Sequence, residues 1–172
     1  LTILTDQKLI GIRDPFGIRP LVIGKLNKSY IFASETCALD IIGAKFVREV
    51  ENGEIVIVNE DSLQSIKPFP KIKERSCIFE YIYFARPDSI IKNVSVYEYR
   101  KRFGSQLAKE THTESDLIVP VPDSGVPAAI GYSEEIKKHM ELGIIRNHYV
   151  GRTFIEPTQQ IRSLGVKLKH SV

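Results

Sequence analysis

The stretch Arg146-Asn-His-Tyr-Val-Gly-Arg-Thr-Phe-Ile155 holds the side chains with the clearest chemical use. It places two arginines, three aromatic-type side chains and one glycine in ten residues that follow neither a helical nor a strand period. Guanidinium groups recognise phosphates, and a loop that closes over a substrate keeps water away from it. The stretch therefore predicts a mobile, cationic loop that covers a phosphorylated substrate.

A second candidate site is the turn Pro122-Asp-Ser-Gly-Val126, which follows a predicted strand and precedes a predicted helix. Ligands bind at such turns in open α/β sheets, because free N–H groups and the helix dipole face one crevice. Asp123 and Ser124 could instead simply cap the helix. On the functional interpretation Ser124 offers an oxygen to Mg²⁺ or its water, as one ligand of an incomplete site.

Basic side chains dominate the stretch that follows this region. From Arg146 to His170 the chain contains a single acidic residue, Glu156, and these basic residues: Arg146, Arg152, Arg162, Lys167 and Lys169. A solvated charged face is the usual explanation of such a run. Its one-sided charge beside a predicted crevice favours binding of a multiply charged phosphate compound.

Other conspicuous residues have structural explanations. Aromatic side chains in a segment such as Glu80–Ser89 more often pack in a hydrophobic core than form a functional site. The turn Asp14–Pro20 is typical of a structural corner. Cys77 is by default a small buried hydrophobe. An iron–sulfur site needs about four ligands, and Cys37 is the only other cysteine in the sequence. The sequence shows no zinc-ligand spacing and no glycine-rich phosphate-binding motif.

The first part of the chain, residues 1–66, is predicted to be an antiparallel meander with one helix. Turn residues separate short β-rich runs at close intervals, which is typical of hairpins. Helical spacing links Ala38, Ile41, Ile42 and Phe46, after Ser34 and Thr36 as candidate caps. The predicted strands are Leu1–Thr5, Lys8–Arg13, Pro20–Lys25, Tyr30–Ala33 and Ile55–Val58.

A basic, proline-bearing connector over residues 67–76 is the predicted domain boundary, and an α/β pattern follows from residue 77. The capping box Ser95–Glu98 predicts a helix whose apolar side carries Val96, Tyr99, Phe103 and Leu107. A further helix is predicted over Val126–Lys138. The predicted strands and apolar runs are Ile78–Phe84, Asp116–Val121 (buried on both faces) and Leu142–Ile145.

Composition excludes several classes of protein. A net charge of +3 over 172 residues is too small by itself to indicate nucleic-acid binding. No apolar run approaches the roughly 20 residues that span a bilayer, and the start of the chain has no signal-peptide pattern. Two cysteines make no disulfide framework, so a cytoplasmic location is expected. The first residue is Leu1 and not Met, and Leu1–Thr5 is typical of the middle of a sheet, so we expect an internal piece of a longer protein.

Five ordered blocks of the sequence together resemble the amidophosphoribosyltransferase (glutamine phosphoribosylpyrophosphate amidotransferase) family. The resemblance covers essentially the whole chain, and its blocks are Asp14–Leu21, Ala33–Leu39, Glu80–Ser89, Pro120–Ser124 and Arg146–Ile155. It implies the C-terminal part of an N-terminal-nucleophile glutaminase domain in residues 1–66. It also implies the front part of a type I phosphoribosyltransferase α/β domain in residues 77–172.

The family's reaction and its site residues follow from the same resemblance. The glutaminase releases ammonia, which displaces pyrophosphate from phosphoribosyl pyrophosphate to give phosphoribosylamine for purine synthesis. Ser124 matches a magnesium-associated serine, and Arg152 would stabilise the pyrophosphate leaving group. The loop Arg146–Ile155, with Gly151 in it, matches the segment that folds over the substrate. The residues that match positions lining the ammonia channel are Tyr149, Thr153, Ile155 and, as a weaker match, Tyr83.

Cofactors and partners are implied in the same way. Cys77 matches the first ligand of a 4Fe-4S cluster in members that have one; members without a cluster can also have Cys there, and we favour no cluster. Magnesium is expected, together with glutamine and phosphoribosyl pyrophosphate as substrates and purine nucleotides as feedback inhibitors. A homo-oligomer is expected of the full-length protein, with no nucleic-acid or membrane partner.

The sequence also departs from the family, since the nucleophilic N-terminal Cys and the paired aspartates of the phosphate-binding loop are not in it. We therefore expect no catalytic residue in this chain, weak substrate binding and no activity of the chain alone. Two alternatives remain: a plain phosphoribosyltransferase, which leaves residues 1–66 unexplained, and a non-catalytic purine-nucleotide-binding module.

Overall fold

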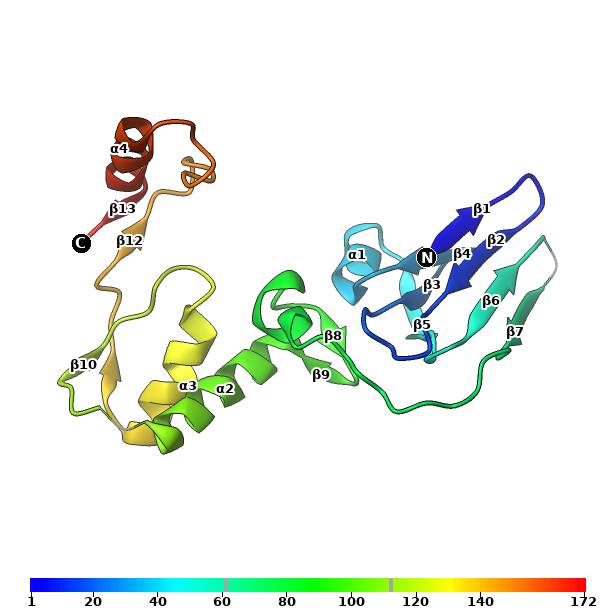
Figure 1. Cartoon of the computed structure of the whole chain (residues 1–172), viewed down its shortest axis with the longest axis horizontal. Coiled ribbons are helices and arrows are strands. Elements are labelled where there is room, and N and C mark those ends of the chain that lie inside the picture. Colours follow the sequence, from blue (N-terminus) through cyan, green and yellow to red (C-terminus); the bar gives the residue numbers. More distant parts are fainter. Residues whose placement is uncertain (61, 112) are drawn as a thin grey trace. The chain divides into compact units, whose positions relative to one another are not determined.

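The computed structural model describes residues 1–60, 62–111 and 113–172. It divides into two compact units, Leu1–Tyr97 and Glu98–Val172. The division falls in the first turn of helix α2 (Val96–Glu110), and Figure 1 follows the elements of each unit along the chain. The fold is mixed α and β, with antiparallel sheets in the first unit and the three longest helices in or entering the second.

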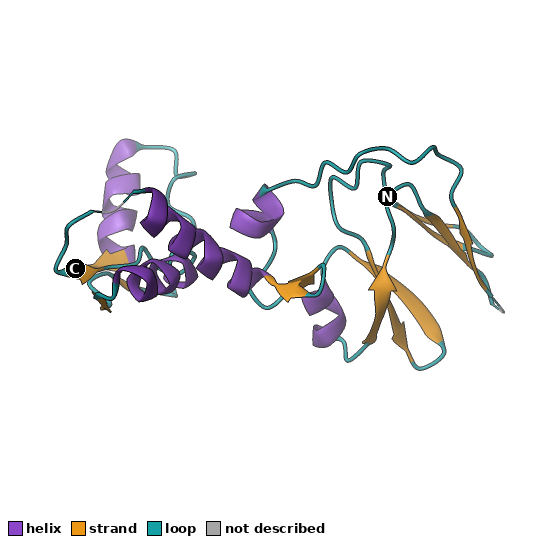
Figure 2. Cartoon of the chain, turned by 90° about the horizontal axis from the view of Figure 1, so that it is seen from below, coloured by secondary structure: helices purple, strands orange, loops and turns teal. Residues whose placement is uncertain are grey.

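Two larger antiparallel sheets lie in the first unit, and Figure 2 shows their strands as separate layers of arrows. The strand order is β1-β2-β6-β7 in one sheet and β4-β3-β5 in the other. The core between them contains Leu21, Ile23, Val50 and Val56. The strands are β1 (Thr2–Leu4), β2 (Leu9–Ile12), β3 (Val22–Leu26), β4 (Ser29–Ala33), β5 (Lys45–Glu49), β6 (Ile55–Val58) and β7 (Leu63–Ile66). All five predicted strands of this part are present, and β5 and β7 are additional.

Helix α1 (Thr36–Ile41) ends earlier than its apolar spacing predicted. Gly43 has a φ of 70°, and its N–H donates to Asp40 O at 3.1 Å while Ala44 N–H donates to Leu39 O at 2.9 Å. This pair of hydrogen bonds is a Schellman motif, which a glycine in the left-handed region stabilises. Phe46 therefore lies on strand β5 and not on the helix, and the helical prediction for it was wrong.

The predicted connector, residues 67–76, lies inside the first unit. Arg75 N–H donates to Phe16 O at 2.8 Å, and Cys77 N–H donates to Ile18 O at 2.9 Å. The structure therefore places the division between its compact units later in the chain than the composition predicted.

The predicted strand Ile78–Phe84 is a short π-helix instead, η1 (Glu80–Phe84). Its defining contact is the hydrogen bond from Ala85 N–H to Glu80 O, at 3.0 Å. Glu80 is only 3 % exposed and forms an ion pair with Arg19. Burial raises the pKa of the Glu80 carboxyl group, Arg19 lowers it, and the first effect prevails. A helical turn satisfies the backbone of this aromatic segment locally, so the segment needs no partner strand.

The second unit contains most of α2, two further helices and short strands. Parallel pairing joins β10 to β11, and antiparallel pairing joins β12 to β13. The hairpin β8 (Ile90–Ile91) and β9 (Val94–Ser95) precedes α2 in the first unit. The elements after α2 are β10 (Leu117–Ile118), α3 (Val126–Ile136), β11 (His139–Met140), β12 (Ile145–Arg146), α4 (Gln159–Lys169) and β13 (His170–Ser171).

Helices α2 and α3 pack through two glycines. A Cβ atom on Gly104 would collide with Ala128 O, and one on Gly131 would collide with Lys101 O. Because the backbones approach so closely, the buried side of α2 runs through Gly104 and Ala108. Phe103 and Leu107 are 37 % and 52 % exposed, so the predicted apolar side of this helix was displaced by one position.

The predicted strand Asp116–Val121 is reduced to β10, and it is not buried on both faces. Leu117 and Val119 are 43 % and 40 % exposed, and Val121 is 65 % exposed. In the described part of the chain β10 pairs only with β11, so it has no second neighbouring strand there. Among the described residues, none of the helices is long and apolar enough to cross a membrane.

Candidate functional site

The turn that links β10 to α3 meets the end of β12 in the second unit. Arg146, the last residue of β12, forms an ion pair with the carboxylate of Asp123 in the turn. Gly125 is the N-cap of α3, and no side chain caps this helix. The capping interpretation of Asp123 and Ser124 was therefore wrong. The Arg146–Asp123 contact brings the turn and the start of the loop together, but the strands that they follow, β10 and β12, belong to two separate sheets in the described residues, so the predicted shared sheet edge is not formed.

Ser124 is exposed on this turn. Within the described residues no group of three or more His, Cys, Asp or Glu side chains could hold a metal ion. The turn therefore fits Mg²⁺ only as an ion held mainly by waters and substrate phosphates, the mode that this cation favours. In that arrangement the Ser124 hydroxyl would supply one oxygen to the ion or to its water, and Mg²⁺ would neutralise phosphate charge.

The cationic loop begins with a turn around Asn147. Asn147 N–H donates to Lys169 O at 2.7 Å, and the Asn147 side-chain oxygen accepts from Tyr149 N–H at 3.0 Å. These bonds fix the backbone on either side of His148. The Tyr149 side chain is fully exposed, so the loop presents this aromatic ring to solvent.

Farther on, the same loop folds back against helix α4. Lys169 Nζ donates to Gly151 O at 3.0 Å, and Arg162 Nη1 donates to Glu156 O at 2.8 Å. A Cβ atom on Gly165 would lie 2.9 Å from Thr153 Cγ2, so the glycine permits this close approach. Two cations of α4 therefore hold backbone carbonyls in the loop and at the residue that follows it, and Arg152 takes no part in these contacts.

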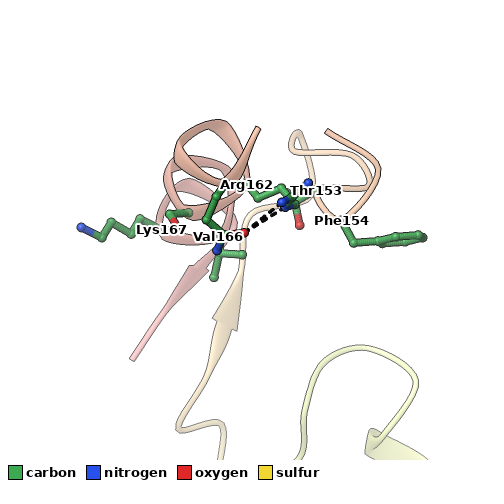
Figure 3. A pocket seen from close by; sticks show the side chains of 7 residues that line it. Thr153, Phe154, Arg162, Val166 and Lys167 are labelled. Atoms are coloured by element: carbon green, nitrogen blue, oxygen red, sulfur yellow. Dashed lines mark hydrogen bonds between the residues drawn. The ribbon is translucent and has the colours of Figure 1, made fainter. Parts of the chain in front are cut away.

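Between the loop and α4 lies a pocket of about 470 Å³. In Figure 3, Thr153 faces the helix, whereas Phe154 points away from it. Arg162 donates from Nε and Nη2 to Gln159 Oε1, at 3.2 Å and 3.0 Å, along one wall of the pocket. The lining residues are Thr153, Phe154, Gln159, Arg162, Ser163, Val166 and Lys167.

Helix α4 is the part of this site that the sequence analysis missed. Its N-cap is Thr158, whose Oγ1 accepts from Ile161 N–H at 3.3 Å. Thr158 followed by apolar residues at positions 161, 164 and 168 is an N-cap signal with helical spacing. That signal is present in the sequence, but the basic residues Arg162 and Lys167 on the same segment also fit a solvated charged face.

The predicted site residues fall into both units. Ser124 and the loop Arg146–Ile155 belong to the second unit, where the Arg146–Asp123 contact brings turn and loop together. Ile155 is 66 % exposed. Tyr83, on η1, belongs to the first unit and is 62 % exposed. The exposed aromatic and aliphatic side chains are available for contact with a ligand or with other protein.

The two cysteines do not form a cluster site between them. Cys77 is half-buried and Cys37 is buried, and the described residues contain no group that could hold a metal ion. Burial raises the pKa of the Cys37 thiol, which disfavours the thiolate that binds iron. The residues of this chain therefore do not fit a 4Fe-4S cluster on their own, and no step of the chemistry is assigned to one.

Individual known proteins that resemble this chain indicate its family. No family model matches the chain. The chain is 60 % identical over 173 residues to the amidophosphoribosyltransferase of Rhizobium etli, covering 98 % of this chain and 35 % of that protein. It is 46 % identical to the amidophosphoribosyltransferase of Archaeoglobus fulgidus, covering 100 % of this chain and 38 % of that protein.

A solved structure agrees with these relatives. The glutamine phosphoribosylpyrophosphate amidotransferase of Bacillus subtilis, complexed with ADP and GMP, superposes with a TM-score of 0.88 at 47 % identity. The match covers 99 % of this chain and 38 % of that chain. The chain thus spans little more than a third of the length of the relatives it matches. Over that stretch, through both compact units, the chain belongs to the amidophosphoribosyltransferase family.

Proposed function

We propose that this chain is part of an enzyme that makes 5-phosphoribosylamine from phosphoribosyl pyrophosphate and glutamine, the first committed step of purine synthesis. The observation that carries the proposal is the ion pair between Arg146 and Asp123, which sets a cationic loop beside a strand–helix turn. Such a turn is where α/β enzymes bind anionic ligands. The identity to amidophosphoribosyltransferases over 98 % of the chain supports the choice of reaction.

Each unit has its own part in this proposal. The two antiparallel sheets of the first unit are assigned to the glutaminase domain, which frees ammonia from glutamine. The second unit is assigned to the phosphoribosyltransferase domain, where Arg152 stabilises the departing pyrophosphate. The residues assigned to the wall of the ammonia channel are Tyr149, Thr153, Ile155 and Tyr83. No catalytic nucleophile is assigned to a residue of this chain.

Purine nucleotides are the proposed regulators. The related B. subtilis enzyme was solved with ADP and GMP, and a nucleotide offers phosphates to the same kind of cationic surface as the substrate does. The full-length enzyme is proposed to form a homo-oligomer and to act in the cytoplasm.

The full-length protein that contains this chain tests the proposal directly. Purified protein with Mg²⁺, phosphoribosyl pyrophosphate and either glutamine or ammonium chloride is expected to release pyrophosphate, measured with a coupled phosphate assay. Release with purine or pyrimidine bases, and not with glutamine or ammonium, would identify a plain phosphoribosyltransferase. Nucleotide binding by calorimetry without any pyrophosphate release would identify a non-catalytic module.

Replacing Ser124 with alanine is expected to raise the Mg²⁺ and phosphoribosyl pyrophosphate concentrations needed for half-maximal rate by about tenfold, as for groups that orient a metal's ligands. Helix α3 should keep its stability, because the Ser124 side chain does not cap it. Titrations of both ligands against Ser124→Ala and the exposed control Ser171→Ala measure the effect. Equal requirements in both variants would contradict the magnesium assignment.

A further inference from the structure

Glu35 lies at the N-terminus of helix α1, but its side chain does not cap that helix. Its Oε2 instead accepts hydrogen bonds from Arg86 N–H and from Ser89 Oγ, both at 2.8 Å. Cys37 Sγ lies 3.6 Å from the same oxygen. A single carboxylate oxygen of the glutaminase-like sheet region thus holds a segment that is more than fifty residues away in the sequence.

Two neighbouring contacts fasten the same segment. Thr36 Oγ1, next to Glu35, accepts from Ile90 N–H at 2.8 Å, and Glu49 Oε1 on β5 accepts from Lys92 N–H at 2.8 Å. Ser89 is fully buried and Thr36 is 6 % exposed. Because these polar groups are buried, the folded protein is destabilised if one of them is left without its hydrogen-bond partner.

The Arg86 side chain does not neutralise Glu35. Its guanidinium forms two hydrogen bonds with Asp88, Nε to Oδ1 at 3.0 Å and Nη2 to Oδ2 at 2.8 Å. The partner of Glu35 is the Arg86 backbone N–H, so the contact fixes the path of the main chain. A charge-assisted bond of this kind is stronger than one between neutral groups.

Tyr83 lies between two fixed points of this main chain. On its N-terminal side Glu80 is buried and paired with Arg19, whose guanidinium also lies 4.6 Å from the centre of the Phe84 ring. On its C-terminal side the backbone turns directly into the Arg86–Glu35 contact. The Tyr83 ring is exposed and lies edge-on to the Phe84 ring of the same segment, with the two ring centroids 6.0 Å apart. We infer that the anchored backbone on both sides sets the position of this short segment and its rings.

We propose that Glu35 is a positioning residue for ammonia transfer, since it holds the backbone that carries Tyr83 in the place where Tyr83 lines the channel. This role rests on the proposed function, in which ammonia made by the first unit is used in the second. Loss of the anchor lets Tyr83 move, and ammonia then escapes to solvent before it reaches phosphoribosyl pyrophosphate. Glutaminase chemistry and the use of external ammonia do not depend on the anchor.

The test compares Glu35→Ala, Glu35→Gln and the control Glu60→Ala in the full-length enzyme. Glu60 is exposed and lies between β6 and β7. Three rates are measured: glutamine hydrolysis, synthesis from glutamine and synthesis from ammonium chloride. Glu35→Ala is expected to lower the ratio of glutamine-dependent to ammonia-dependent synthesis about tenfold, the size expected from the loss of one hydrogen-bonded charge.

Glu35→Gln is the matched rescue variant. All three donors meet one oxygen, Oε2, and the amide oxygen of glutamine can occupy the same place. The ratio of glutamine-dependent to ammonia-dependent synthesis in Glu35→Gln should therefore be close to that of the unmodified enzyme. In Glu60→Ala the ratio should be unchanged. A uniform fall of all three rates in Glu35→Ala, or an unchanged ratio, overturns the positioning role.

Hydrogen exchange separates this inference from the proposed function. Peptides that cover residues 81–91 should exchange faster in Glu35→Ala than in the unmodified protein, as measured by mass spectrometry. Unchanged exchange refutes the anchor itself. If the unmodified enzyme makes no product from either nitrogen donor, the proposed function fails and the role in ammonia transfer fails with it, whereas faster exchange would still establish the anchor.

Discussion

Replacement of Arg152 by alanine in the full-length enzyme is expected to reduce phosphoribosylamine synthesis from either nitrogen donor by about a hundredfold or more, as when a charge-stabilising group of a transition state is lost. Arg152 is exposed on the loop, and the loop is held on α4 by Lys169 and Arg162, not by Arg152. Its guanidinium is therefore available for the pyrophosphate, while the fold of the loop should survive the substitution.

The decisive measurement is the pair of rates for synthesis and for basal glutamine hydrolysis. Hydrolysis is assigned to the first unit in the proposed function, so it should be unchanged in Arg152→Ala. Arg102→Ala is the matched control, because Arg102 is an exposed arginine of the second unit that pairs with Glu98 on the same helix. Wild-type synthesis in Arg152→Ala, or an equal loss in Arg102→Ala, would contradict the assignment of Arg152 to the leaving group.

Tyr149→Ala is expected to act differently from Arg152→Ala. The Tyr149 ring is fully exposed while Asn147 Oδ1 holds its backbone N–H, so the side chain can line a channel without supporting the loop. Synthesis from glutamine should fall while synthesis from external ammonia remains. If both fall equally, Tyr149 contacts the substrate and not the path of ammonia.

The features that sequence predicted well are those that local residues determine. The hairpin turns at Asp6-Gln7 and Asn27-Lys28 separate β-rich runs, and the strands around them form where they were expected. The turn at Asp123 was also expected to lie near the loop at Arg146, and their ion pair brings them together, although β10 and β12 are not neighbours in one sheet among the described residues.

The features that sequence missed depend on distant partners. Buried Glu80 pairs with Arg19, sixty-one positions earlier in the sequence, and no local pattern reveals that the aromatic run Ile78–Phe84 closes as a helix. Similarly, the buried side of α2 is selected by Gly131 of α3 and not by the apolar residues of α2. The role of Glu35 was equally hidden, since its partners lie beyond residue 85.

Glu54 is expected to be the charge on which the stability of the first unit depends most. It is 1 % exposed, and its two oxygens accept from Arg48 Nη2 and Nη1 at 2.7 Å and 2.8 Å. Ser65 Oγ and Glu51 N–H add further hydrogen bonds. Burial alone would raise the pKa of Glu54, but these donors, with Arg48 first, outweigh burial and lower the pKa to about 2.

The sign of the pH dependence follows from this depressed pKa. The stabilisation is complete above the unfolded-state value of 4.5 and is lost as the pH falls toward the folded-state value of about 2. Such a shift corresponds to about 3 kcal/mol of unfolding free energy at neutral pH. Glu54→Gln should lose about that much at pH 7, because the partly buried Arg48 guanidinium is left without its counter-ion.

Urea-induced unfolding of the chain, followed by circular dichroism between pH 7 and pH 2.5, distinguishes this prediction from a general acid effect. The difference between the unmodified chain and Glu54→Gln should shrink as the pH falls below 4.5, since the carboxyl group of the unmodified chain then takes up a proton in the unfolded state while it is still ionised in the folded state. Glu51→Gln is the matched control: this carboxylate is 66 % exposed and pairs with Lys67 at the surface, so its loss should cost less than about 1 kcal/mol. A difference that stays constant down to pH 2.5 would mean that the shape of Glu54, and not its charge, holds the two sheets together.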